Sequence, residues 1–285
     1  MQKPVRIAVI GSSTAAGQGA EPTEKSWVNL YRAYLKGQHP ENDVINLGLG
    51  GLQTFQLLPT GFSVPPKRPV PDPERNITKA LLFQPDAVIV NAPSNDAAAF
   101  YGPEEQLQNF DAIIHAAQMA GVPVWIGTTQ PREFSAVQID IQIRLKDAIL
   151  SRYAPRALNF WDCLATPKNL PDPRFALGDG AHLNNAGHAR VFEQVKKGNL
   201  PEAIVAWKKQ MALSPKLPAG PELNIPQLTQ GKVQIEVYDA LAQLRYRGTG
   251  VLPMKIPNIR GRAGQYWVRV AGTNFHRLLP WTKTA

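Results

Sequence analysis

The sequence contains very little cysteine: Cys163 is the only one among 285 residues. A single cysteine excludes an intrachain disulfide and a cysteine-rich metal site. Because Cys163 lies in the apolar stretch Phe-Trp-Asp-Cys-Leu-Ala, we expect it to be a buried packing residue rather than a nucleophile. The histidines lack the spacing and the supporting carboxylates of metal ligands. We therefore expect neither a metal nor another cofactor.

Long hydrophobic runs are also missing. No stretch of 18 or more apolar residues occurs, and this excludes a membrane-spanning helix. The opening apolar run, residues 5–10, is too short for the core of a signal peptide and ends in a Gly-Ser turn. It is therefore typical of a buried strand.

Acidic residues are scarce only at the C-terminal end. Of the net charge of +9, residues 214–285 contribute +7, from 10 Lys and Arg against 3 Asp and Glu. Residues 1–213 are almost balanced, with 21 basic against 19 acidic residues. Because no nucleic-acid-binding motif accompanies the basic segment, we interpret it as a solvated basic surface and expect no nucleic-acid partner.

The first 200 residues alternate short apolar segments with amphipathic ones. The apolar segments are rich in β-branched residues and predict buried parallel strands at residues 5–10, 44–47, 87–90, 122–126 and 157–160. Between them lie helical patterns, such as the one from Trp27 to Leu35 with Thr23 as its expected N-cap. Another contains Phe110 and ends at Gly121. This alternation predicts a three-layer α/β/α domain with a five-stranded parallel sheet over residues 1–213.

Two segments interrupt this pattern, and the period then changes. Residues 60–76 contain five prolines, which predicts a long structured loop. The Pro-rich residues 214–223 predict a semi-rigid linker. Beyond it, apolar and polar residues alternate with a period of two, and we expect a small antiparallel β-domain over residues 224–285.

The first predicted strand continues directly into Gly-Ser-Ser-Thr-Ala-Ala-Gly-Gln-Gly at residues 11–19. The glycine spacing does not match the G-x-G-x-x-G cradle for a dinucleotide. A turn of this kind can instead hold a nucleophilic serine at the start of a helix, whose N–H groups would stabilise an oxyanion. A serine-rich helix cap explains the segment equally well.

A loop near residue 180 offers the groups that a nucleophilic serine requires. Asp179 and His182 are three residues apart in a glycine-containing loop, so carboxylate and imidazole can lie side by side. A serine needs such a base, and the base needs a carboxylate to fix its tautomer. An Asp-x-x-His pair also occurs often by chance in ordinary surface loops.

Two further segments follow the second and third predicted strands. Gly-Leu-Gly-Gly at residues 48–51 can expose a backbone N–H, and Asn95 can donate from its side-chain amide. Each has an ordinary interpretation as turn chemistry. In a parallel sheet, however, all of these segments meet at the carboxyl edge, where ligands bind.

Taken in the order Ser, Gly, Asn, Asp-His, these segments resemble those of the SGNH (GDSL-like) hydrolases. That family's blocks read Gly-Asp-Ser-x-x-x-Gly, a glycine after the second strand, Gly-x-Asn-Asp and Asp-x-x-His. The resemblance extends over about residues 5–200. It implies a flavodoxin-like fold, with Ser13 as nucleophile, His182 as general base and Asp179 as its orienting acid.

The resemblance also implies an oxyanion hole made by the N–H groups of Ser13 and Gly51 and the side chain of Asn95. Gly50 is an alternative to Gly51, because sequence does not fix the register of adjacent glycines. The chain departs from the family at Ser12, where aspartate is usual, and at Pro93, where glycine is usual. Ser12 therefore creates a choice of nucleophile, and the spacing to Gly17 favours Ser13.

The implied activity is that of a serine esterase that acts through an acyl-enzyme on small esters, above all acetyl esters of carbohydrates. A short-chain carboxylesterase or a lysophospholipase acting on lipid esters is the alternative within this class. From another class, the two departures are also compatible with a non-catalytic carbohydrate-binding protein on a degenerate hydrolase scaffold.

The C-terminal β pattern carries a second resemblance. Residues 233–244, 252–259 and 264–270 are similar to the C-terminal sorting domain of type IX secretion in Bacteroidetes. This implies export machinery as a partner and a secreted or cell-surface protein whose leader is absent from this sequence, although a cytoplasmic location stays open. The alternatives are a carbohydrate-binding module, with Tyr266 and Trp267 or Trp281 as stacking rings, and a β-domain that merely packs on the enzyme.

Overall fold

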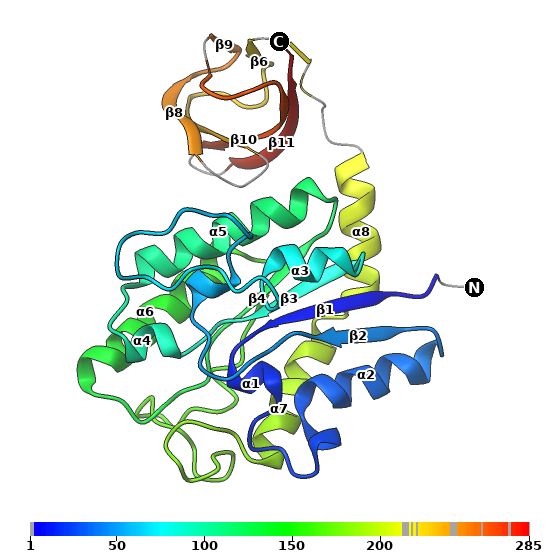
Figure 1. Ribbon diagram of the computed structural model, residues 1–285, viewed down its shortest axis with the longest axis vertical. Coiled ribbons are helices and arrows are strands. Elements are labelled where there is room, and N and C mark those ends of the chain that lie inside the picture. Colours follow the sequence, from blue (N-terminus) through cyan, green and yellow to red (C-terminus); the bar gives the residue numbers. More distant parts are fainter. Residues whose placement is uncertain are drawn as a thin grey trace. The chain divides into compact units, whose positions relative to one another are not determined.

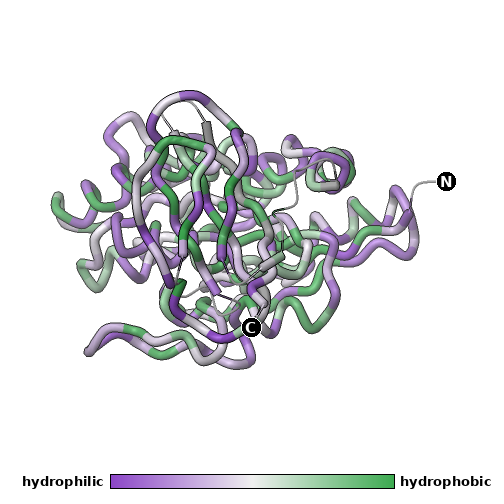
Figure 2. The backbone as a smooth tube through the Cα atoms, turned by 90° about the horizontal axis from the view of Figure 1, so that it is seen from above, coloured by the Kyte–Doolittle hydropathy of each residue, from purple (hydrophilic) through white to green (hydrophobic). Residues whose placement is uncertain are grey.

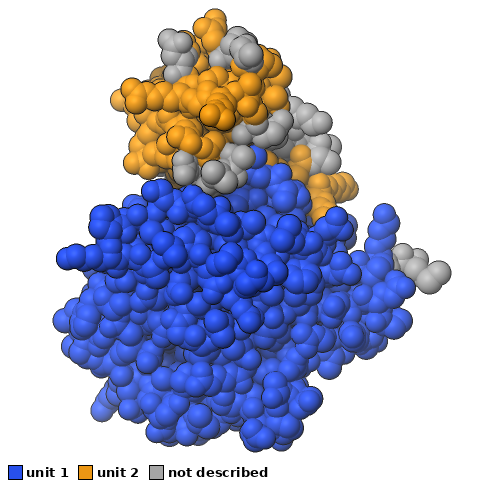
Figure 3. Space-filling model, viewed as in Figure 1, with its two compact units in different colours: residues 1–206 blue, residues 207–285 orange. Residues whose placement is uncertain are grey.

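The computed structural model describes residues 3–212, 217, 219–220, 222–239, 244–257, 259–272 and 275–284. The chain forms two compact units, residues 1–206 and 207–285 (Figure 3). Much of the predicted linker lies outside the described residues. The division between the units falls within the helix α8 (Leu200–Ala212).

A parallel sheet forms the centre of the first unit (Figure 1). Its strands are β1 (Arg6–Gly11), β2 (Asp43–Asn46), β3 (Ala87–Asn91), β4 (Val124–Gly127) and β5 (Ala157–Leu158), in the order β2-β1-β3-β4-β5. All four pairings are parallel. Each strand overlaps one of the predicted apolar segments. The prediction of an α/β/α fold with a five-stranded parallel sheet is confirmed.

Helices cover both faces of this sheet (Figure 1). Besides α8, they are α1 (Ser13–Ala16), α2 (Trp27–Gln38), α3 (Ile77–Leu82), α4 (Asn95–Ala98), α5 (Pro103–Met119), α6 (Ala136–Arg152) and α7 (Asn185–Lys197), with 3₁₀ turns η1 (Thr23–Lys25) and η2 (Thr54–Leu57). Ile7 and Val9 pack with Trp27 of α2 and Val191 of α7 in one core cluster. Because side chains alternate along a strand, Ala8 points to the opposite face, where α3, α5 and α6 lie.

The predicted N-cap of α2 is wrong by one turn. Thr23 begins η1 instead, and Ser26 caps α2, with its Oγ accepting a hydrogen bond from the backbone N–H of Asn29 at 3.4 Å. A 3₁₀ turn directly before a helix moves the cap without changing the apolar pattern of the helix. The end of α5 agrees with its prediction, since Gly121 follows in the left-handed region with φ of +70°.

The Pro-rich residues 60–76 contain neither helix nor strand, as predicted. The segment is nevertheless ordered by hydrogen bonds at both ends. Asn76 donates to Thr60 Oγ1 at 2.9 Å, and the N–H of Asp72 donates to the carbonyl of Gln56 at the same distance.

Cys163 is partly buried against the main core, and burial raises the pKa of its thiol to about 11.

The second unit contains two antiparallel sheets. One has the order β11-β10-β7-β8, and the other pairs β6 with β9. The strands are β6 (Leu223–Ile225), β7 (Lys232–Asp239), β8 (Leu244–Val251), β9 (Met254–Ile256), β10 (Gly264–Gly272) and β11 (Phe275–Lys283). Figure 2 shows hydrophilic and hydrophobic residues interspersed along the backbone, and along β7 the two kinds alternate. The small antiparallel β-domain is confirmed.

The proposed stacking rings of this unit are buried. Tyr266 and Trp281 belong to its apolar core, and only 3% and 1% of their surfaces are exposed. Trp267 is buried as well. A ring that binds sugar must present an open face, so the carbohydrate-binding alternative loses the residues on which it rested.

Candidate active site

Ser13 lies where β1 gives way to α1, at the carboxyl edge of the sheet. Gly11 ends the strand with φ of +151°, and a Cβ there would lie 2.6 Å from the carbonyl oxygen of Asn91. Only glycine therefore allows β1 to end this close to β3. Ser12 occupies the N-cap position of α1 without a capping hydrogen bond from its side chain, and Gly17 ends the helix in the left-handed conformation. Both serines are almost buried.

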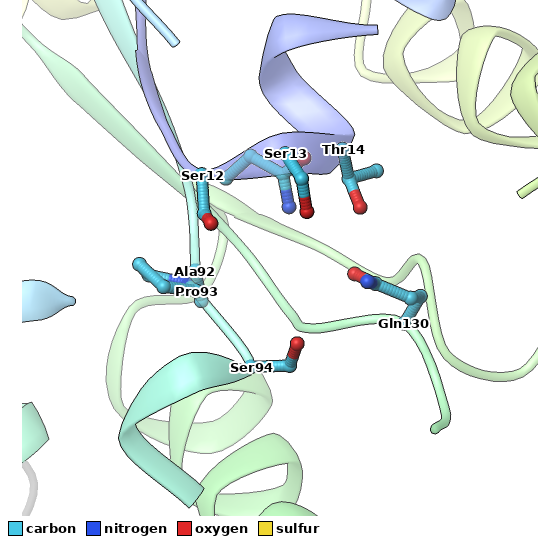
Figure 4. Close-up of a pocket in the computed structure, with 8 residues that line it drawn as sticks. Ser12, Ser13, Thr14, Ala92, Pro93, Ser94 and Gln130 are labelled. Atoms are coloured by element: carbon cyan, nitrogen blue, oxygen red, sulfur yellow. The ribbon is translucent and has the colours of Figure 1, made fainter. Parts of the chain in front are cut away.

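A small pocket lies in front of these serines. It is a shallow depression of about 160 Å³, a volume that includes space open to solvent. In Figure 4 the hydroxyls of Ser13 and Thr14 point toward a space that Gln130 and Ser94 face from the other side. Thr14 Oγ1 and Asn91 Oδ1, which also line it, have no hydrogen-bond partner among the described residues.

Asp179 and His182 are in direct contact. Asp179 Oδ2 lies 2.6 Å from His182 Nδ1, while its Oδ1 accepts the backbone N–H groups of Ala181 and His182 at 2.9 and 2.8 Å. Partial burial opposes ionisation of Asp179, but these hydrogen bonds outweigh it and lower its pKa to about 2. The carboxylate therefore stays charged and fixes one ring nitrogen of His182 as a donor.

The loop that carries this pair is fastened to the neighbourhood of Ser13. Gln130 of the pocket donates to the carbonyl of Ala181 at 3.2 Å. A Cβ on Gly19 would lie 2.1 Å from the carbonyl oxygen of Leu183, so the chain after Ser13 passes directly beside the chain after His182. Among the described residues, no hydrogen bond joins Ser13 Oγ to the imidazole.

The two candidate oxyanion glycines have different surroundings. A Cβ on Gly50 would lie 3.9 Å from Ser13 Cβ, whereas a Cβ on Gly51 would meet nothing within 4 Å. Gly51 has φ of +85°, a conformation that glycine adopts without strain. The glycine pair therefore lies beside Ser13, and the choice between its two N–H groups stays a prediction.

Asn95 begins α4, and its amide is held at three points. Nδ2 donates to Ser12 Oγ at 2.7 Å and to the carbonyl of Leu52 at 2.9 Å, and Oδ1 accepts from Arg132 at 3.2 Å. A flipped amide would place two donors together at Arg132 and two acceptors together at Leu52. The partners thus require the orientation in which Nδ2 faces Ser12.

Sequence reasoning did not single out Arg132. This arginine follows β4 and also donates to Ser94 Oγ, a pocket residue, at 3.4 Å. Its guanidinium lies 4.8 Å from the centre of the Phe134 ring. In the sequence, only the position of Arg132 could have indicated a role in the site. Gln130 and Arg132 come just after the carboxyl end of a predicted strand.

Asp96 is a second residue that sequence reasoning did not use. Its side chain is fully buried and accepts hydrogen bonds from Thr54 Oγ1 at 2.5 Å and from the backbone N–H of Thr54. Burial raises the pKa of this carboxyl to about 7, although the bonds from Thr54 oppose the rise. The contact fastens η2 to the start of α4 and so helps to position Asn95.

The described residues contain neither a metal-binding cluster nor a membrane-spanning helix. Within them, no group of three or more His, Cys, Asp or Glu side chains is arranged to hold a metal ion. No helix in the described part of the chain is long and apolar enough to cross a membrane.

The chain belongs to the GDSL-like lipase/acylhydrolase family, whose model matches residues 9–190. The match includes every site residue discussed above. Membership of this family indicates a hydrolase that acts on esters. A search of curated proteins found no match.

Solved structures agree on the fold. One is a candidate lipolytic protein of the G-D-S-L family from Desulfitobacterium hafniense, 20% identical, with a TM-score of 0.53 over 68% of this chain and 99% of that one. Another is the esterase EstA from Pseudoalteromonas, 15% identical, with a TM-score of 0.51 over 70% and 98%. A third is a candidate acylhydrolase from Bacteroides fragilis, 18% identical, with a TM-score of 0.50 over 71% and 91%.

Proposed function

We propose that the chain is a serine esterase in which His182 takes the proton of Ser13 as Ser13 Oγ attacks an ester carbonyl. Asp179 orients the imidazole and stabilises its protonated form. The alcohol then leaves, and water releases the acyl group from Ser13. The observation that carries the proposal is the 2.6 Å contact between Asp179 and His182, in a loop that Gln130 links to the pocket of Ser13.

In this mechanism the oxyanion accepts hydrogen bonds from the N–H groups of Ser13 and Gly51 and from Asn95 Nδ2. The position of Ser13 at the start of α1 supports the first of these donors. The fixed orientation of the Asn95 amide supports the third, because its Nδ2 already faces a hydroxyl oxygen at 2.7 Å.

We further propose that the acyl group is short, with acetyl esters of carbohydrates as the substrate class. The depression beside Ser13 is shallow and encloses too little space for a long acyl chain. Pro93, which stands where the family usually has glycine, lines this pocket and narrows it. A long lipid acyl chain would not fit this space.

The test is a series of p-nitrophenyl esters of increasing chain length, with acetylated xylan and lysolecithin as natural-type substrates. We expect kcat/KM to be highest for acetate and to fall at least about tenfold by octanoate, since overpacking a full pocket costs more than about 1 kcal/mol. A preference for octanoate or for lysolecithin would contradict the short-acyl proposal. Failure of a fluorophosphonate probe to label any serine would favour a non-catalytic binding protein.

For the second unit we propose the role of a sorting module for type IX secretion. Its small size and its two antiparallel sheets support this proposal. If the full chain is expressed behind a leader peptide in a bacterium with this secretion system, we expect it outside the cell. Removal of residues 224–285 should leave the remainder in the periplasm, and secretion of the shortened chain would contradict the role.

A further inference from the structure

Arg132 is a half-buried cation beside the pocket residue Ser94, and no carboxylate in the described part of the chain forms an ion pair with it. No carboxylate oxygen in the described part of the chain lies within 4 Å of its guanidinium. Nη1 donates to Asn95 Oδ1 and Ser94 Oγ, whereas Nε and Nη2 have no hydrogen-bond partner among the same residues. Burial lowers the pKa of this guanidinium, although the nearby charge of Asp179 opposes the change.

Asp179 is near Arg132 but forms no ion pair with it within 4 Å. Oδ2 contacts the His182 ring, and Oδ1 accepts two backbone N–H groups. Two other arginines of the first unit do form ion pairs: Arg68 pairs with Glu105 and Arg144 with Glu104. Taking a cation partly out of water without an anionic partner costs free energy.

From this arrangement we infer that Arg132 binds an anionic group of the substrate, so that the preferred esters carry a carboxylate or phosphate close to the scissile bond. The N–H donors on Nε and Nη2 form the planar fork that matches such an anion. The inference rests on the proposed esterase function and narrows it from acetylated carbohydrates to acetylated acidic sugars.

The anionic group could belong either to the acyl side or to the alcohol side of the ester. Ser94 lines the pocket and also accepts a hydrogen bond from Arg132, which places the guanidinium next to a pocket residue. The acyl group proposed above is acetyl, which carries no anionic group. The anionic group therefore belongs to the alcohol.

The test uses two acetyl esters of similar size that differ in charge, 3-acetoxybenzoate and 3-acetoxybenzamide. We expect the wild-type protein to have a kcat/KM at least about tenfold higher for the charged ester, as one charged hydrogen-bonded contact provides. Arg132→Gln keeps a donor for Asn95 but loses the charge. This variant should lower the ratio of the two kcat/KM values at least about tenfold, mainly through KM, while Arg132→Lys should retain part of it.

Arg144→Gln is the matched control, because Arg144 is an exposed arginine on α6 that pairs with Glu104. It should leave the ratio unchanged, and thermal unfolding should show that every variant is folded. A comparison of 3-acetoxyphenyl phosphate with 3-acetoxybenzoate, and of acetylated polygalacturonate with acetylated xylan, identifies the preferred anion and its carrier.

Three outcomes separate the possibilities. An equal loss on charged and neutral esters in Arg132→Gln would mean that Arg132 acts only by holding the Asn95 amide, and would overturn the inference. A wild-type ratio near one would also overturn it, with the esterase function intact. Absence of turnover with every ester would contradict the proposed function itself and the inference with it.

Discussion

Replacement of Ser13 by alanine is expected to lower kcat for p-nitrophenyl acetate by ~10⁶, to the background rate, because no other group would form the acyl-enzyme. Stability should change little, since the substitution removes one oxygen from a side chain at the start of α1. The measurement is the initial rate, together with thermal unfolding of the same sample.

Ser12→Ala is the decisive comparison, and Ser151→Ala, on the exposed surface of α6, is the neutral control. We expect Ser12→Ala to retain turnover, because its hydroxyl is engaged by Asn95 rather than by a base. Mass spectrometry after fluorophosphonate labelling should find the adduct on Ser13. Turnover in Ser13→Ala together with its loss in Ser12→Ala would move the nucleophile by one residue.

Asp179→Asn should lower kcat by ~10⁴ while preserving the fold. The amide of asparagine would donate to His182 Nδ1, so the ring would carry its proton on Nε2 and could not accept the proton of Ser13. The measurement is kcat for p-nitrophenyl acetate between pH 5 and pH 8.

The pH dependence of this loss provides a further check. The pKa of Asp179 is lowered to about 2, so the wild-type carboxylate is ionised throughout that range and protonates only as the pH falls toward 2. Protonation of Asp179 should therefore contribute nothing to the pH dependence of the loss between pH 5 and pH 8. A loss of less than about tenfold would show that His182 works without Asp179, contrary to the proposed triad.

The architecture of the first unit was largely predictable because strands and helices each have their own pattern of apolar residues. Residues 87–90 are apolar throughout, as a strand buried on both faces requires, and they lie within β3. The cap of α2 was not predictable in the same way. Thr23 and Ser26 are both acceptable N-caps, and only the intervening 3₁₀ turn selects Ser26.

Within the site, sequence motifs identified residues that are close along the chain, such as Asp179 and His182. They did not identify contacts that depend on strand order. Ser12 meets Asn95 because β1 and β3 are neighbours with Gly11 opposite Asn91. Arg132 meets Asn95 because β4 follows β3 in the sheet. A single sequence contains the residues of such contacts but no signal for the order of the strands.

The hydrogen bond between Asn95 and Ser12 affects how strongly Asn95 would bind the substrate and how strongly it would bind the transition state. Both amide hydrogens of Asn95 are already used, one by Ser12 Oγ and one by the carbonyl of Leu52. A neutral substrate carbonyl that displaces Ser12 Oγ exchanges one neutral hydrogen bond for another and gains little affinity. A tetrahedral oxyanion gains more, because charge-assisted hydrogen bonds are about twice as strong. Asn95 would thus favour the transition state over the ground state, and its contribution would appear in kcat rather than in KM.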